Sequence, residues 1–102
     1  MVSFAELGVR PAFVEELARA GITEPFAVQA LTLPDGLAGR DVCAKAKTGS
    51  GKTIAFALPL VQRLTPSGDS HPRGLVLVPT RELAVQVVGV LSPLGKKAGL
   101  VV

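Results

Sequence analysis

The chain has 102 residues and a net charge of +3, and 48% of its residues are hydrophobic. This size suffices for one small domain, and this hydrophobicity predicts a packed core rather than a disordered chain. No apolar run approaches the ~20 residues of a membrane span, and the first ten residues lack the order of a secretory signal. Since the single cysteine cannot form an internal disulfide, the composition predicts a cytoplasmic protein with no membrane partner.

The charge is distributed unevenly along the chain. Residues 1–39 carry two basic and five acidic residues, a net charge of −3, whereas residues 40–102 carry nine basic and three acidic residues, a net charge of +6. A basic second part favours a polyanionic ligand such as a nucleotide or a nucleic acid. An ordinary solvated basic face explains the same charge equally well, so charge alone does not decide between them.

The chain is expected to begin with a short turn and a helix. Ser3 and Glu6 have the spacing of a capping box, which predicts a helical turn at the start. The next segment has Pro11 at the first position of a helix and Gly21 just past its end. Phe13, Leu17 and Ala20 recur at helical spacing and mark the buried face of this helix.

A second helix follows the same plan. Pro25 is expected to open it, and Pro34 followed by Gly36 to close it. We therefore assign residues 1–39 to an N-terminal helical region.

From residue 40 onward the pattern alternates between strands and helices. Residues 41–46 are a short strand candidate, and we expect Cys43 within it to be a small core residue. A buried helix is expected from Lys52 to Leu64, kinked at Pro59. Residues 74–79 have the continuous apolar character of a strand buried on both faces.

The last part of the chain predicts a helix and one more strand. Residues 80–91 form a helix pattern with Thr80 as N-cap, and the terminal residues resemble the opening of a third strand. The order predicts an α/β fold, a parallel sheet with flanking helices. Two strands and a stub leave apolar surface uncovered, so we expect the front part of a larger domain, with self-association through an exposed sheet edge.

The stretch AKTGSGKT, from Ala46 to Thr53, has the chemistry of a phosphate-binding loop. Its glycines let successive backbone N–H groups converge on phosphate oxygens, and the following helix adds its positive end. Lys52 would reach the β and γ phosphates and Thr53 would ligate Mg²⁺, so these two are also the catalytic candidates. The nucleotide-binding candidates in this stretch are Ala46, Lys47, Thr48, Gly49, Ser50, Gly51, Lys52 and Thr53. The alternative is a Gly-Ser-rich turn that happens to precede a helix.

Hydrolysis needs a second Mg²⁺ anchor and a group that positions water. No apolar run in this chain ends in Asp or Glu, as such an anchor usually does. Binding of nucleotide without hydrolysis is therefore the expectation for this chain.

Three stretches occur in an order that resembles the DEAD-box ATP-dependent RNA helicases. GITEPFAVQ (21–29) looks like the Q motif, AKTGSGKT (46–53) like motif I, and PTRELA (79–84) like motif Ia. Phe4 lies 17 residues before Gly21, where that family places an isolated aromatic residue. The resemblance implies that residues 1–39 are the Q-motif region and residues 40–102 the first part of an incomplete RecA-like P-loop domain.

The resemblance also implies ligands and residue roles. ATP and Mg²⁺ are the expected cofactors, and RNA is bound through its backbone independently of sequence. Gln29 would select adenine, with Phe4 and Phe26 near the base, and Pro79, Thr80 and Arg81 would contact the RNA sugar–phosphate backbone. Core packing explains both phenylalanines about equally well.

Two alternatives remain. One is a P-loop NTPase of another class, which nucleotide preference would distinguish, and the other is a non-enzymatic interaction fragment. The Asp-Glu-Ala-Asp motif, the Ser-Ala-Thr motif and a second RecA-like domain are missing from this sequence. The expected function is therefore the ATP-binding part of an RNA helicase that unwinds or remodels duplexes, with the isolated fragment binding ATP at most.

Overall fold

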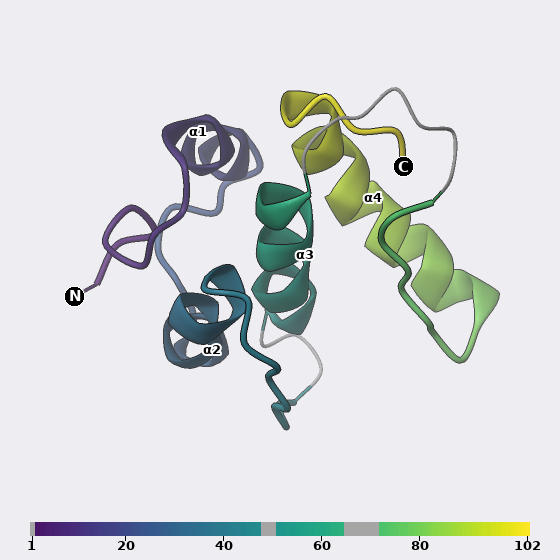
Figure 1. The fold of residues 1–102 in the computed structure, drawn as a ribbon, viewed down its shortest axis with the longest axis horizontal. Coiled ribbons are helices and arrows are strands. Elements are labelled where there is room, and N and C mark those ends of the chain that lie inside the picture. The colour runs from purple at the N-terminus through teal and green to yellow at the C-terminus, as the bar shows by residue number, and fades with distance from the viewer. Residues whose placement is uncertain (1, 48–50, 65–71) are drawn as a thin grey trace.

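The computed structural model describes residues 2–47, 51–64 and 72–102. These residues form four helices: α1 (Pro11–Arg19), α2 (Ala27–Leu37), α3 (Lys52–Arg63) and α4 (Arg81–Lys97). Helix α3 lies in the centre of Figure 1, with α1 and α2 on one side and α4 on the other. Helix α3 packs on both α2 and α4, and α1 packs on α4.

The start and end of α1 confirm the prediction from sequence. Pro11 occupies the first turn, and Gly21 follows the helix with a φ of +83°. The N–H groups of Gly21 and Ile22 donate to the carbonyls of Ala18 and Leu17 at 3.0 and 2.8 Å, which is the Schellman pattern that ends a helix.

The capping box at the start of the chain is also confirmed. The Ser3 N–H donates to Glu6 Oε1 at 3.2 Å, and the Glu6 N–H donates to Ser3 Oγ at 3.1 Å. These two reciprocal bonds stabilise the turn that precedes α1.

Two helices run further than predicted because they continue through a proline. Pro34 was expected to close the second helix, but α2 extends to Leu37, and α4 passes through Pro93 to Lys97 instead of ending at Leu91. A proline inside a helix costs about 3 kcal/mol. Burying one leucine contributes about 1.5–3 kcal/mol, and each proline adjoins a buried leucine, Leu33 or Leu94. Packing therefore offsets the cost of the proline.

Pro59 lies inside α3, as predicted, and it forms part of a close helix contact. A Cβ atom added to Gly36 would lie only 2.8 Å from Pro59 Cγ. Helices α2 and α3 therefore approach each other at a point where only glycine fits.

The expected sheet is not confirmed, because no strand occurs in residues 2–47, 51–64 or 72–102. Leu75 and Leu77 are 80% and 85% exposed, whereas Val76 and Val78 pack against the core. Burial of this segment on both faces was therefore a wrong prediction, although its side chains alternate as in a strand. A strand needs neighbouring strands to which its backbone can hydrogen-bond. The expectation that this apolar segment has too few neighbours to cover it is confirmed.

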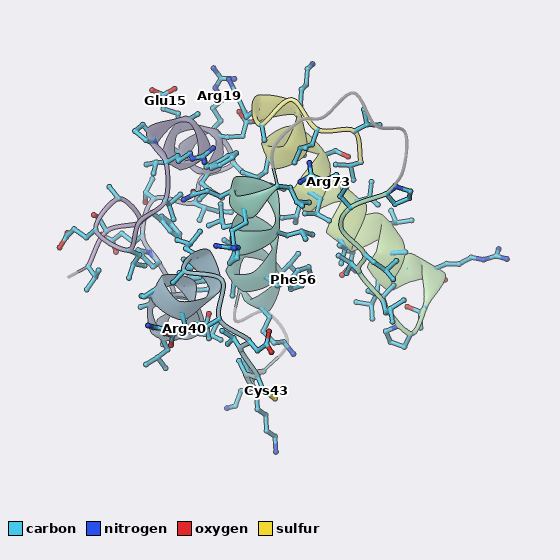
Figure 2. All side chains as sticks on the ribbon, viewed as in Figure 1. Glu15, Arg19, Arg40, Cys43, Phe56 and Arg73 are labelled. Atoms are coloured by element: carbon cyan, nitrogen blue, oxygen red, sulfur yellow. The ribbon has the colours of Figure 1, made fainter. Side chains whose placement is uncertain are left out.

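The segment before the phosphate loop shows the same difference. Cys43, expected in the core, is exposed, and Figure 2 shows it at the lower end of the molecule, away from the helices. No strand among the described residues lies beside residues 41–47, so the described part of the chain leaves this position uncovered. The third strand expected at the end of the chain is likewise not formed, and Val101 is fully exposed.

The core consists of aliphatic and phenylalanine side chains from the four helices and the first turn. Its largest fully buried apolar members are Phe4, Phe13, Leu33, Leu58 and Leu94. None of the helices in the described ranges combines the length and apolar character that crossing a bilayer requires.

Candidate nucleotide-binding site

The phosphate end of the site is the start of α3. Gly51 is the N-cap, with a φ of +84°, and Lys52 and Thr53 are the first two helical residues. The N–H groups of a first helical turn have no acceptor within the helix, so they are available to an anion. The Lys52 side chain is exposed and Thr53 is partly exposed. A cation, a hydroxyl and free N–H groups are thus placed together.

The remaining residues of the predicted loop are only partly described. Ala46 and Lys47 end the segment that leads to the loop, and Lys47 is exposed. Thr48, Gly49 and Ser50 lie outside the described residues.

Gln29 joins the second helix to this phosphate end. Its side chain is 2% exposed. Oε1 accepts from the Phe26 N–H at 2.9 Å, and Nε2 donates to the Gly51 carbonyl at 3.0 Å. An amide has two N–H donors and two acceptor lone pairs, so one of each remains for a further partner.

Gly51 is the residue with least room at this junction. A Cβ atom there would lie 2.9 Å from Phe26 Cδ2 and closer still to Gln29 Nε2. Its positive φ also disfavours any other residue. The contact between Gln29 and Gly51 therefore depends on glycine for both backbone conformation and space.

The two predicted aromatic residues differ in accessibility. Phe26 is 56% exposed beside Gln29, so its ring presents a surface that a flat ligand can contact. Phe4 is 2% exposed and belongs to the hydrophobic core. Its observed surroundings are those of a core residue.

A cavity of about 690 Å³ lies along α3 beside Lys52 and Thr53. Its lining is mainly apolar and comes from α2, α3, α4 and the segments around residues 40–44 and 75–78. A triphosphate requires N–H donors and cations, and the end at Lys52 and Thr53 supplies both. The rest of the lining is mostly apolar, apart from Thr32 and Arg40, and includes residues of the two segments that were expected to be strands.

The segment expected to contact RNA lies at the start of α4. Thr80 is the N-cap and its Oγ1 accepts from the Leu83 N–H at 3.2 Å, as predicted. Pro79, Thr80 and Arg81 are exposed. In Figure 1 α3 runs upward from its first residue and α4 runs from the lower right toward the upper left, so the positive ends of both helices point toward the lower part of the view.

Sequence reasoning did not identify the partner of Gln29. The two residues of this hydrogen bond are 22 positions apart, so no local pattern predicts the pair. The Gln29 Oε1 bond to the N–H of Phe26, three residues earlier, has a local signal, because a Gln at the third helical position is half of a capping box.

Comparison with known proteins agrees with these features. The DEAD/DEAH box helicase family matches residues 26–102. The probable ATP-dependent RNA helicase DDX28 of Homo sapiens is 51% identical over 98% of this chain, which covers 20% of that protein. The chain thus spans about a fifth of the length of this relative.

Two solved structures show the same arrangement. The RNA helicase Prp28 from Chaetomium thermophilum, bound to ADP, has a TM-score of 0.90 and 34% identity, covering 100% of this chain and 26% of that one. Dbp5 of S. cerevisiae, bound to RNA and ADP BeF3, has a TM-score of 0.84 and 35% identity, covering 93% and 25%. These neighbours are RecA-like helicase domains, and the chain belongs to the DEAD/DEAH box helicase family.

Proposed function

We propose that this chain is the ATP-binding, N-terminal part of an ATP-dependent RNA helicase that unwinds or remodels RNA duplexes. The hydrogen bond from Gln29 Nε2 to the Gly51 carbonyl carries this proposal. It joins an amide suited to the adenine edge to the turn that begins the phosphate-binding helix. The names of the relatives support the same activity, and the chain covers about a fifth of the length of one of them.

The roles of the site residues follow from their chemistry. The remaining N–H and lone pair of Gln29 would pair with adenine, and the exposed ring of Phe26 would lie against the base. Lys52 and the free N–H groups of α3 would bind the phosphates. The Thr53 hydroxyl fits Mg²⁺, a hard cation that prefers oxygen ligands and binds together with phosphates.

Pro79, Thr80 and Arg81 would hold an RNA phosphate at the start of α4. The first-turn N–H groups and the Arg81 guanidinium supply donors for such a contact, which positions a strand without distinguishing bases. We assign residues 1–39 and 40–102 to the Q-motif region and the start of the RecA-like domain. This division stays a prediction.

A binding titration with fluorescent ATP and GTP analogues and Mg²⁺ tests the proposal. We expect ATP-selective binding by the unaltered chain, loss of binding in Lys52→Ala and loss of selectivity in Gln29→Ala. Lys97→Ala is the matched control, because Lys97 is an exposed lysine in the last turn of α4. Equal binding of ATP and GTP by the unaltered chain would favour a P-loop NTPase of another class, and no binding at all would favour an interaction fragment.

We also propose that the isolated chain self-associates through residues 75–78. Leu75 and Leu77 are exposed beside the cavity, and a segment with strand-like alternation and no neighbouring strand among the described residues is a template for pairing. This partner is another copy of the chain, and its test is given with the predictions below.

A further inference from the structure

The last turn of α3 holds the beginning of the chain through one glutamine. Gln62 Oε1 accepts from the Arg10 N–H at 3.0 Å, and Gln62 Nε2 donates to the Gly8 carbonyl at 2.8 Å. Both halves of the side-chain amide are therefore bonded to the backbone just before α1. These partners are 52 and 54 residues away in sequence, so the contact is purely tertiary.

The next residue of the same turn holds the end of α2. Arg63 Nη1 donates to the Leu37 carbonyl at 3.3 Å. A Cβ atom on Gly39 would lie 2.6 Å from Arg63 Cζ, so the guanidinium rests against the turn that ends α2. A cation at the carbonyl end of a helix also interacts favourably with the helix dipole.

These contacts lie at the opposite end of α3 from the nucleotide site. Lys52 and Gln62 are ten residues apart on the helix, roughly 15 Å at the usual rise. At the near end, Gln29 of α2 bonds to Gly51, and Gly36 touches Pro59 between the two ends. Two helices joined at one end can change their crossing angle, whereas attachment at both ends restricts it.

We propose that Gln62 and Arg63 are positioning residues for ATP binding. They hold residues 2–39 in a fixed position relative to the start of α3. Phe26 and Gln29 thereby stay beside Gly51 and Lys52. The adenine half and the phosphate half of the site are thereby kept at the spacing of one nucleotide. This inference rests on the proposed function and concerns residues that do not touch the nucleotide.

A comparison of two ligands tests this role. Gln62→Met keeps the length of the side chain and removes both hydrogen bonds. We expect its affinity for the ATP analogue to fall roughly fivefold, the size of one net hydrogen bond, while its affinity for inorganic tripolyphosphate is unchanged. Tripolyphosphate uses only the phosphate half, so general unfolding would weaken both ligands together. Gln86→Met, at an exposed glutamine of α4, should change neither affinity.

Two further variants complete the set. Gln62→Glu keeps the acceptor for the Arg10 N–H but loses the donor to Gly8, so it should recover part of the ATP affinity. Arg63→Met should also lower the affinity for ATP selectively, with Lys97→Met as its control. An unchanged ratio of ATP to tripolyphosphate affinity in both Gln62→Met and Arg63→Met overturns the proposal.

Hydrogen exchange at the Arg10 amide separates this inference from the proposed function. If the unaltered chain binds no ATP, the proposed function fails, but the attachment itself can still be measured. Faster exchange at Arg10 in Gln62→Met than in Gln86→Met supports the attachment. Equal exchange in the two variants shows that Gln62 does not hold the segment and overturns the inference.

Discussion

The α2–α3 pair and the segment of residues 72–78 are both rich in apolar residues but differ in how many of these residues are buried. In the helix pair, Leu33 and Leu58 are fully buried, and Gly36 meets Pro59 with no room for a side chain. In the segment, Leu75 and Leu77 remain almost entirely exposed, and only Val76 and Val78 pack against the core. Hydrophobicity alone therefore did not decide burial.

The difference follows from where each element finds its hydrogen bonds. A helix satisfies its backbone groups internally and needs only one apolar face covered. A strand needs at least one neighbouring strand to satisfy its backbone and a covered surface on each buried face. Helices consequently form in this chain while the expected strands do not.

The largest expected effect compares a buried leucine with an exposed one. Leu58→Ala should lower the free energy of unfolding by about 2–5 kcal/mol, because Leu58 is fully buried in α3 and its truncation leaves a cavity in the core. Leu77→Ala should change it by less than about 0.5 kcal/mol. Urea denaturation of both variants followed by circular dichroism makes the comparison. Similar losses would show that residue 77 is buried in solution.

A second prediction concerns the glycine at the junction of the site. Gly51→Ala places a side chain at a residue with positive φ and in close contact with Phe26 and Gln29. We therefore expect the free energy of unfolding to fall by about 1–3 kcal/mol and ATP binding to weaken. Gly89→Ala is the control. Gly89 lies in α4 with nothing within 4 Å of an added Cβ, and alanine should stabilise the helix by about 0.5–1 kcal/mol. Thermal denaturation shows whether the two changes differ in sign, and a stable, ATP-binding Gly51→Ala would contradict the geometry of the site.

A third, smaller effect is expected at the start of α4. Thr80→Ala removes the acceptor for the Leu83 N–H and should cost about 1 kcal/mol, whereas Thr80→Ser retains the hydroxyl and most of the stability. The measurement is the denaturation midpoint of each variant. If alanine and serine behave alike, the cap contributes nothing in solution.

Adding positive charge to residues 75–78 should have the smallest effect on folding. Its effect on the self-association of the chain should be clear. The double variant Leu75→Lys and Leu77→Lys should leave the free energy of unfolding within about 1 kcal/mol of the original, because both side chains are exposed. Its sedimentation should indicate a monomer at concentrations where the unaltered chain associates. Val85→Lys, at an exposed valine of α4, is the control for added charge alone. A monomeric unaltered chain would remove the case for association through this segment.

Much of the helical structure was predictable because its signals are local. The Ser3–Glu6 box, the glycine after α1 and the Thr80 cap each depend on residues within five positions, and all three are present. Pro34 was misjudged as a helix end, and the helix predicted over residues 80–91 continues through Pro93 to Lys97. Local rules account for the free-energy cost of a proline inside a helix. The packing of the leucines next to each proline depends instead on distant parts of the chain.

In the candidate site, too, local features were predictable from the sequence and contacts between distant residues were not. The spacing of residues 46–53 predicted a phosphate loop, and Lys52 and Thr53 are the first two residues of α3. The hydrogen bonds made by Gln29, Gln62 and Arg63 are different, because each joins residues that lie 22 to 54 positions apart. A single sequence contains no local pattern that predicts such pairs.

The sequence by itself determined where α1, α3 and α4 begin, which stretch has the spacing of a phosphate loop, and which family the chain resembles, because these depend on residue type and spacing over a few positions. Tertiary structure decided which apolar residues are buried, which prolines a helix tolerates, and which backbone groups Gln29 and Gln62 bind. Each of those outcomes depends on a partner brought close by the fold, and a free energy of packing can reverse a local preference of a few kcal/mol.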